Sequence, residues 1–268
     1  MSTPSTETFD ISSAQLEPGT VAIVTRAHKG PDKGEPQRKL QKNAKGVCVS
    51  DVNTSLGRKT VDEFADRFGE DRVMFVYCDV TSASDVEELF AKTKERFGAV
   101  NLVVNNAGII DEKAFDLAIN VNITGVARGT FTAIKYMSPE MGGKGGKIIN
   151  ISSTAGFVPI AILAVYVATK YAVLGLTKSL MADPRLRAQG ITFGVLCPGF
   201  VDTRLYEKWV LRHQEEDQKE GDEAAEKYGM LDVSAVREAL LRLVLDKAWS
   251  GKVMAVTKME GIYDATSK

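Results

Sequence analysis

Residues that commonly bind metals or form covalent cross-links are scarce in this sequence. It has two histidines and three cysteines among 268 residues. His28 and His213 are far apart, and Cys48, Cys78 and Cys197 lie in apolar runs without metal-ligand spacing. This pattern argues against a histidine or cysteine metal site and against a disulfide-stabilised secreted scaffold. We predict no metal site and three reduced thiols in the core of a cytoplasmic protein.

The sequence also lacks an excess of charge of either sign. Lys and Arg total 34 and Asp and Glu total 35, so the formal net charge is −1. Binding to nucleic acid or to an anionic membrane usually needs a basic surplus, so neither partner is expected. No apolar run approaches the roughly 20 residues of a membrane span. Residues 1–18 are polar, lack the features of a secretory signal and are interpreted as a flexible tail.

Short β-branched runs alternate with longer segments of helical periodicity. The runs that predict strands are 21–25, 47–51, 73–77, 102–105, 147–151, 191–197 and 253–256. They are apolar at nearly every position, which is typical of parallel strands covered on both faces. The segments between them carry apolar residues at helical spacing. This alternation predicts a single α/β domain over 19–262 with a doubly wound, mostly parallel Rossmann-type sheet, which binds ligands at the carboxyl ends of its strands.

The expected helix between the first two strands is the exception. Residues 26–45 contain seven Lys or Arg and two prolines, and their apolar side chains are limited to Ala27, Leu40 and Ala44. A crossover helix needs an apolar stripe to pack on the sheet. The sequence therefore predicts an atypical first crossover.

Tyr166 and Lys170 form the most informative pair of side chains. They are four residues apart in a helical segment, so they share one helix face. An ammonium beside a phenol stabilises the phenolate and lowers the tyrosine pKa below its usual value of ~10. Such a tyrosine can exchange a proton with an alcohol or a ketone near neutral pH. Ser153, at the end of a predicted strand, can hold the substrate oxygen. Taken alone, a Tyr-x-x-x-Lys pair occurs by chance in many helices.

Further motifs surround this pair. They are Asn105-Asn106-Ala107-Gly108 after a strand, Val121-Asn122-Ile123-Thr124-Gly125 in a helix, Pro198-Gly199-Phe200-Val201-Asp202-Thr203 after another strand, and a Ser153-to-Tyr166 separation of thirteen residues. With them the chain resembles the short-chain dehydrogenases/reductases from about Val21 to Val256. The resemblance is nearest to the 15-hydroxyprostaglandin dehydrogenase-like branch, which includes similar fungal alcohol dehydrogenases of polyketide pathways.

The resemblance implies a catalytic set of four residues. Tyr166 would be the general acid/base, and Ser153 would orient the substrate oxygen. Lys170 would lower the tyrosine pKa and bind the nicotinamide ribose, and Asn122 would hold a water that passes protons to solvent. The structural alternative for Asn122 is a residue at a helix kink. The implied reaction is NAD-linked oxidation of a secondary alcohol to a ketone.

The implied cofactor is NAD, with NADP less favoured. Asp51 ends the second predicted strand, where a carboxylate can bind both ribose hydroxyls of NAD and repel the extra phosphate of NADP. The alternative for Asp51 is a turn or cap residue before Asn53. The full predicted cofactor-binding set is Thr25, Gly30, Asp51, Asp79, Val80, Asn106, Ala107, Gly108, Tyr166, Lys170, Pro198, Gly199, Val201 and Thr203.

The first turn departs from the family pattern. The family has Thr-Gly-x-x-x-Gly-x-Gly, whereas residues 25–32 keep only Gly30 and have Arg26 and Asp32 at the other glycine positions. Asp32 would repel the pyrophosphate, and Pro31 removes a backbone donor. Three explanations remain: a rebuilt loop, a lost cofactor site, or a reading-frame or splice-boundary error in the sequence.

The substrate and the assembly are predicted from later residues. By the resemblance, 203–230 is a lid over the substrate, and its bulky Leu205, Tyr206, Trp209 and Val210 suit an apolar alcohol or ketone. These four could equally pack on the core. The helix after Tyr166 is more apolar than one buried face requires, which favours a homodimer or homotetramer. The alternative function is a catalytically silent binding or scaffold protein that has lost dinucleotide binding.

Overall fold

The computed structural model describes residues 18–25, 44–201, 223 and 225–268. Several predictions lie outside these ranges, namely those for residues 1–17, for most of the atypical crossover with Gly30, and for Thr203, Leu205, Tyr206, Trp209 and Val210.

The centre of the molecule is an eight-stranded sheet with the order β3-β2-β1-β4-β5-β6-β7-β8. All neighbouring strands are parallel except β7 and β8. The strands are β1 (Val21–Thr25), β2 (Gly46–Asp51), β3 (Val73–Tyr77), β4 (Leu102–Asn105), β5 (Gly146–Ile151), β6 (Ile191–Pro198), β7 (Val253–Thr257) and β8 (Gly261–Asp264). The predicted doubly wound, mostly parallel α/β fold is thus confirmed, and its seven predicted strands lie within a residue of those observed.

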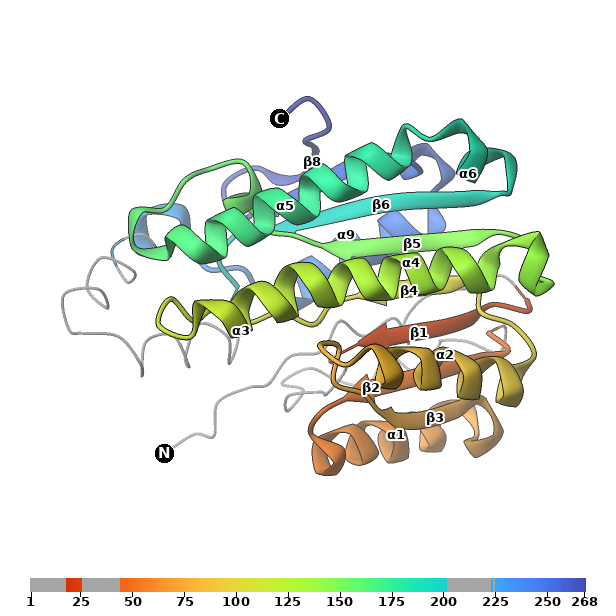
Figure 1. Cartoon of the computed structure of the whole chain (residues 1–268). Coiled ribbons are helices and arrows are strands. Elements are labelled where there is room, and N and C mark those ends of the chain that lie inside the picture. Colours follow the sequence, from red (N-terminus) through yellow and green to blue (C-terminus); the bar gives the residue numbers. More distant parts are fainter. Residues whose placement is uncertain (1–17, 26–43, 202–222, 224) are drawn as a thin grey trace.

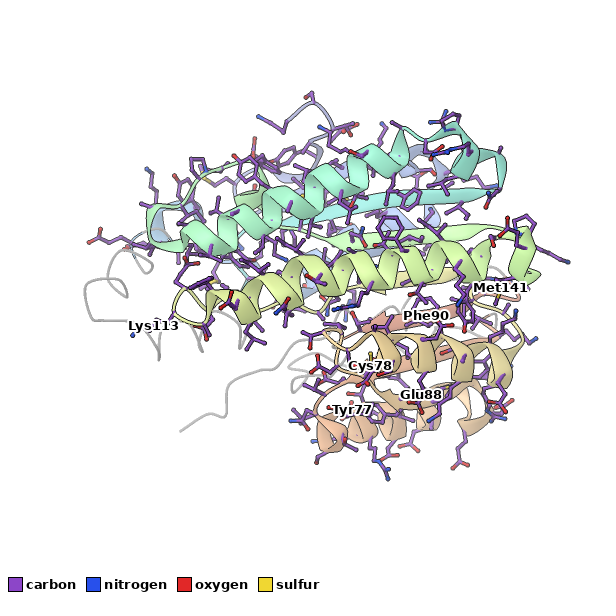
Figure 2. All side chains as sticks on the ribbon, viewed as in Figure 1. Tyr77, Cys78, Glu88, Phe90, Lys113 and Met141 are labelled. Atoms are coloured by element: carbon purple, nitrogen blue, oxygen red, sulfur yellow. The ribbon has the colours of Figure 1, made fainter. Side chains whose placement is uncertain are left out.

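Helices cover both faces of the sheet, which explains the nearly continuous apolar runs. Figure 1 shows α2 (Ala83–Phe97), α4 (Val126–Met137) and α5 (Ala164–Met181) in front of the sheet and α9 (Val233–Leu245) behind it. Within β1, Ile23 joins the cluster under α2 and α4, whereas Val24 joins the cluster that holds α1 (Thr54–Phe68) and α9. Phe90 of α2 lies against α4, where its ring centroid is 5.4 Å from that of Tyr136 (Figure 2).

Shorter elements connect the main ones. They are α3 (Phe115–Ile119), α6 (Pro184–Ala188), a π-helical segment (Asn120–Gly125), and the 3₁₀ segments Glu70–Arg72, Pro139–Met141, Thr154–Gly156, Ala161–Leu163 and Lys247–Trp249.

Helix α5 is both long and apolar. Among the described residues, Ala161–Met181 is the one helical segment whose length and composition would allow it to cross a bilayer, and 39% of its apolar window is buried. A helix that covers a sheet meets the same criteria, and α5 packs Leu174 against Val195 of β6. Its composition alone therefore does not indicate a membrane span.

The cysteines allow a direct test of core burial. Cys48, Cys78 and Cys197 are free and buried, and burial raises the pKa of each thiol to about 12. Because the thiolate is the reactive form, we expect iodoacetamide at pH 8 to label none of them in the native protein and all three in guanidinium, as counted by intact mass. Native labelling, or fewer than three labels in guanidinium without reductant, would contradict this arrangement.

The same pKa shift makes the folding stability depend on pH. The unfolded thiols ionise near 9, whereas the buried thiols stay neutral until about 12. The contribution of thiol burial to folding is thus fully present below pH 9 and declines as the pH rises above it.

Candidate active site

Tyr166 and Lys170 lie at the carboxyl edge of the sheet, in the first turns of α5. Both side chains are buried, and the Lys170 Nζ is 5.4 Å from the centroid of the Tyr166 ring. The ammonium also donates a hydrogen bond of 3.1 Å to the carbonyl of Ile151, the last residue of β5. The predicted shared helix face is therefore present. This arrangement places a positive charge beside a phenol that is largely shielded from water.

The start of α5 depends on a residue that the sequence patterns did not indicate. Leu163, at the N-cap position, has no side-chain hydrogen bond to the helix. The carboxylate of Glu112 supplies the acceptors instead: its Oε2 accepts from the Val165 N–H at 2.8 Å and its Oε1 from the Tyr166 N–H at 2.9 Å. Glu112 lies 54 residues before Tyr166, so no local capping pattern could reveal it.

Asn122 lies in the π-helical segment between α3 and α4 and is completely buried. Its Oδ1 accepts from the Ile109 N–H at 2.8 Å, and its Nδ2 donates to the Ile109 carbonyl at 2.8 Å and to Thr169 Oγ1 at 3.0 Å. Both amide protons are thus donated within the protein. Short π-helical segments are frequent at functional sites, so the segment fits both the predicted catalytic role and the kink alternative.

Gly108, in the turn after β4, lies close to the side chains of Asn122 and Lys170. A Cβ atom at Gly108 would lie 3.4 Å from the Asn122 Oδ1 and 3.5 Å from the Lys170 Nζ. At these distances a Cβ would be in ordinary van der Waals contact with both polar groups. Residue 108 therefore adds no side chain between this turn and the two polar groups.

Ser153 lies between the ends of two strands. Its Oγ donates to the Pro198 carbonyl at the end of β6 and accepts from the Ala155 N–H, both at 3.2 Å. The neighbouring Ser152 Oγ donates to the Lys170 carbonyl at 2.9 Å. Ser153 therefore joins the predicted Pro198 segment to β5, which itself contacts the Lys170 ammonium.

Thr25 connects the end of β1 with the Asn105–Gly108 turn. Its Oγ1 accepts from the N–H groups of Asn106 and Ala107 at 3.0 and 3.1 Å, and the Asn106 Nδ2 donates to the Thr25 carbonyl at 3.2 Å. Between β1 and β4 the strand order reverses direction. Open α/β sheets bind ligands at such a reversal, beyond the carboxyl ends of the strands.

The acidic residues predicted to meet the cofactor also make structural contacts. Asp51 is buried at the end of β2, and its Oδ1 accepts from the Asn53 N–H at 2.8 Å, as the turn alternative predicts. Asp79 Oδ1 accepts from the N–H and hydroxyl of Thr81, each at 2.8 Å. Val80 packs against Gly125, where an added Cβ would lie 2.7 Å from a Val80 methyl.

The Pro198 segment continues from β6 toward the predicted lid. The Gly199 N–H donates to the Val256 carbonyl at 2.8 Å, and Val201 pairs with Leu231. The ring of Tyr228 stacks on that of Phe200, with 6.3 Å between centroids. The described end of the segment predicted as a lid therefore contacts the strand end that bears Pro198.

One side of Tyr166 is apolar. Tyr166 forms a buried cluster with Ala155 and Leu163, and partly buried aliphatic side chains pack against it, namely Ile110, Ile160, Ile162 and Val167. Within the part of the chain that the structure describes, no group of three or more His, Cys, Asp or Glu could hold a metal ion. Among the described residues, the candidate site thus offers the Lys170 ammonium, the hydroxyls of Tyr166 and Ser153, and an apolar wall.

Comparisons with known proteins identify the family and the fold of the chain. The model of the short chain dehydrogenase family matches residues 20–214. The 15-hydroxyprostaglandin dehydrogenase [NAD(+)] of Rattus norvegicus is 35% identical over 252 residues, which cover 91% of this chain and 93% of that protein. The protein of the same name from Mus musculus is 36% identical over 249 residues, with 91% and 92% coverage. The crystal structure of levodione reductase shares the fold, with a TM-score of 0.72, 21% identity, and 92% and 99% coverage.

Proposed function

Because the chain belongs to the short-chain dehydrogenase family, we propose that it is an NAD-dependent oxidoreductase that interconverts a secondary alcohol and a ketone. The observation that carries the proposal is that four side chains lie near one edge of the sheet: Tyr166 and Lys170 at the start of α5, Ser153 after β5, and Asn122 in the π-helical segment. The relatives named for NAD(+) support this cofactor.

The described residues provide a suitable set of groups for this cofactor. A buried carboxylate, Asp51, ends β2 next to β1, and Gly108 places no side chain against the Lys170 ammonium. When bound, NAD would supply the hydride acceptor. Asp51 would bind its adenosine ribose, Lys170 its nicotinamide ribose, and Asp79 and Val80 its adenine. Thr25, Asn106, Ala107, Pro198, Gly199 and Val201 would line the remaining length of the site.

The protein side chains would carry the proton chemistry. Ser153 would hold the hydroxyl oxygen of the alcohol, and Tyr166 would accept the hydroxyl proton as the carbonyl forms. Lys170 would stabilise the phenolate that receives this proton. Because both amide protons of Asn122 are donated to Ile109 and Thr169, a relay water at Asn122 would be held by one of its oxygen acceptors. The apolar cluster around Tyr166 favours an apolar substrate.

A cofactor titration tests this proposal. We expect NADH to bind with micromolar affinity and NADPH at least about tenfold more weakly, since repulsion of ~1.4 kcal/mol between Asp51 and the extra phosphate suffices for that factor. Protein fluorescence would follow both titrations. Asp51→Asn should reduce the preference, because it removes the charge and keeps the shape. A screen of apolar secondary alcohols with NAD would then identify substrates.

One specific observation favours a second function. Arg26 and Asp32 replace glycines in the first turn, which argues for a silent binding or scaffold protein. Absence of binding by both NADH and NADPH would support that alternative and contradict the proposed enzyme.

A homodimer or homotetramer and a cytoplasmic location complete the proposal. Phe131 of α4, which is about half exposed, is compatible with burial between two subunits.

A further inference from the structure

Glu112 closes a ring of contacts that passes through both Tyr166 and Asn122. The ring starts at the Tyr166 N–H, which donates to Glu112. It follows the chain back to Ile109, whose N–H and carbonyl are both bonded to the Asn122 amide. From Asn122 it continues to Thr169 Oγ1, which donates to the Tyr166 carbonyl at 2.7 Å. Tyr166 and Asn122, the two ends of the proposed proton path, are therefore connected twice. One connection runs through Glu112 and Ile109, and the other runs through Thr169.

The segment that carries Glu112 is itself held in place. The Oδ1 of the preceding Asp111 accepts from the N–H groups of Lys113 and Ala114, at 3.2 and 2.8 Å. Lys113 is exposed and points outward at the edge of the molecule (Figure 2). The turn therefore separates the two neighbours, with Lys113 toward solvent and Glu112 toward α5.

A carboxylate suits this position for two reasons. It presents two acceptor oxygens and no donor, so it can accept from Val165 and Tyr166 at the same time. The first turn of a helix also carries partial positive charge, so an anion there makes stronger hydrogen bonds than a neutral amide. Glutamine has a single oxygen, so it would leave one of the two N–H groups facing an amide nitrogen.

We propose that Glu112 is a positioning residue that holds the backbone of Tyr166 and, through Ile109, the side chain of Asn122 in one fixed arrangement. Its effect on turnover rests on the proposed function. Its effect on the backbone does not. The test therefore has two readouts, hydrogen exchange and steady-state kinetics. It compares wild type with Glu112→Gln, Glu112→Asp and a control, Asp116→Asn, which removes the same charge from an exposed residue four positions away.

Hydrogen exchange measures the ring directly. In Glu112→Gln we expect the amides of Val165 and Tyr166 to exchange about five- to tenfold faster, the change that loss of one typical hydrogen bond produces. Because the ring is closed, the segment 109–112 should also exchange faster. Asp116→Asn should leave both segments unchanged. Unchanged exchange in Glu112→Gln would overturn the proposal, whether or not the wild-type protein turns over any alcohol.

The kinetic readout separates positioning from simple helix capping. With NAD and 1-phenylethanol as the probe substrate, Glu112→Gln should lower kcat at least about tenfold, because small displacements of catalytic groups are costly, while its Kd for NADH stays within about twofold. Glu112→Asp keeps the negative charge at the start of α5, so its thermal stability should return to that of the wild type. Its side chain is shorter, so its kcat should remain as low as that of Glu112→Gln. Full kcat in either variant would overturn the positioning role.

Failure of the proposed function would look different. Suppose that the wild-type protein oxidises no alcohol, and that exchange is faster in Glu112→Gln but not in Asp116→Asn. Glu112 would then still be the residue that fixes Tyr166, and the dehydrogenase proposal would be rejected. If Glu112→Gln does not fold, Glu112→Asp decides: full activity and wild-type exchange in it would overturn the inference, and loss of kcat in a folded protein would support it.

Discussion

Substitution of Tyr166 by phenylalanine is expected to reduce kcat for alcohol oxidation by about a thousandfold, within the range that general acid–base catalysis contributes. The change removes only the hydroxyl. The ring would keep its contacts with Ala155 and Leu163 and its place beside the Lys170 ammonium. Stability and NADH affinity should therefore change little. The measurement is the initial rate of NADH formation with a saturating alcohol from the substrate screen, together with a fluorescence titration of NADH.

The neighbouring tyrosine provides the matched control. Tyr171 lies on the same helix, but its side chain is 45% exposed. Tyr171→Phe removes an identical hydroxyl and should change kcat by less than about twofold, as is usual for surface substitutions. If Tyr166→Phe retained a substantial part of the wild-type rate, another group would have to transfer the proton, and the role assigned to Tyr166 would be wrong.

The sequence predicted the central strands well because their signal is local. In β1, Ile23 and Val24 face opposite clusters of the core, so both are apolar and the run reads as a buried strand. Strand β8 was missed for the converse reason. It is a four-residue antiparallel edge strand with half-buried and exposed residues, so neither alternation nor a continuous apolar run marks it.

The candidate site was predicted only as far as its motifs reach. The pairing of Tyr166 with Lys170 follows from helix geometry. By contrast, Glu112 is 54 residues from its partner Tyr166, and Thr169 is 47 residues from its partner Asn122. No spacing rule connects residues so far apart. The predicted ribose role of Asp51 remains a prediction, and the structure shows that its Oδ1 accepts from the Asn53 N–H. Gly30 and Thr203 lie outside the described residues.

A buried polar network under the site is equally hidden from sequence patterns. The Asn105 Nδ2 donates to the Asn150 Oδ1 at 2.8 Å and to the Thr130 Oγ1 at 3.1 Å, and the Asn150 Nδ2 donates to the Thr177 Oγ1 at 2.9 Å. These side chains link β4 and β5 to α4 and α5. All four are buried, so a broken hydrogen bond among them would leave a polar atom without water.

Gly129 on α4 makes this network sensitive to a single methyl group. A Cβ at this position would lie 2.2 Å from the Asn105 Oδ1, closer than nonbonded atoms can approach. Gly129→Ala must therefore displace Asn105 or the helix. We expect the free energy of unfolding to fall by about 2–4 kcal/mol, the sum of overpacking and a disrupted buried hydrogen bond. Urea denaturation followed by circular dichroism would measure the change.

Gly175 on α5 separates this steric effect from helix propensity. It is exposed, and a Cβ there would meet nothing within 4 Å. Gly175→Ala should raise the free energy of unfolding by about 0.5–1 kcal/mol, because alanine loses less conformational freedom than glycine in a helix. The same substitution should thus have opposite signs in two helices of one protein. If Gly129→Ala were also stabilising, α4 would not approach Asn105 as closely as the structure shows, and the network would not depend on the absence of a side chain at that position.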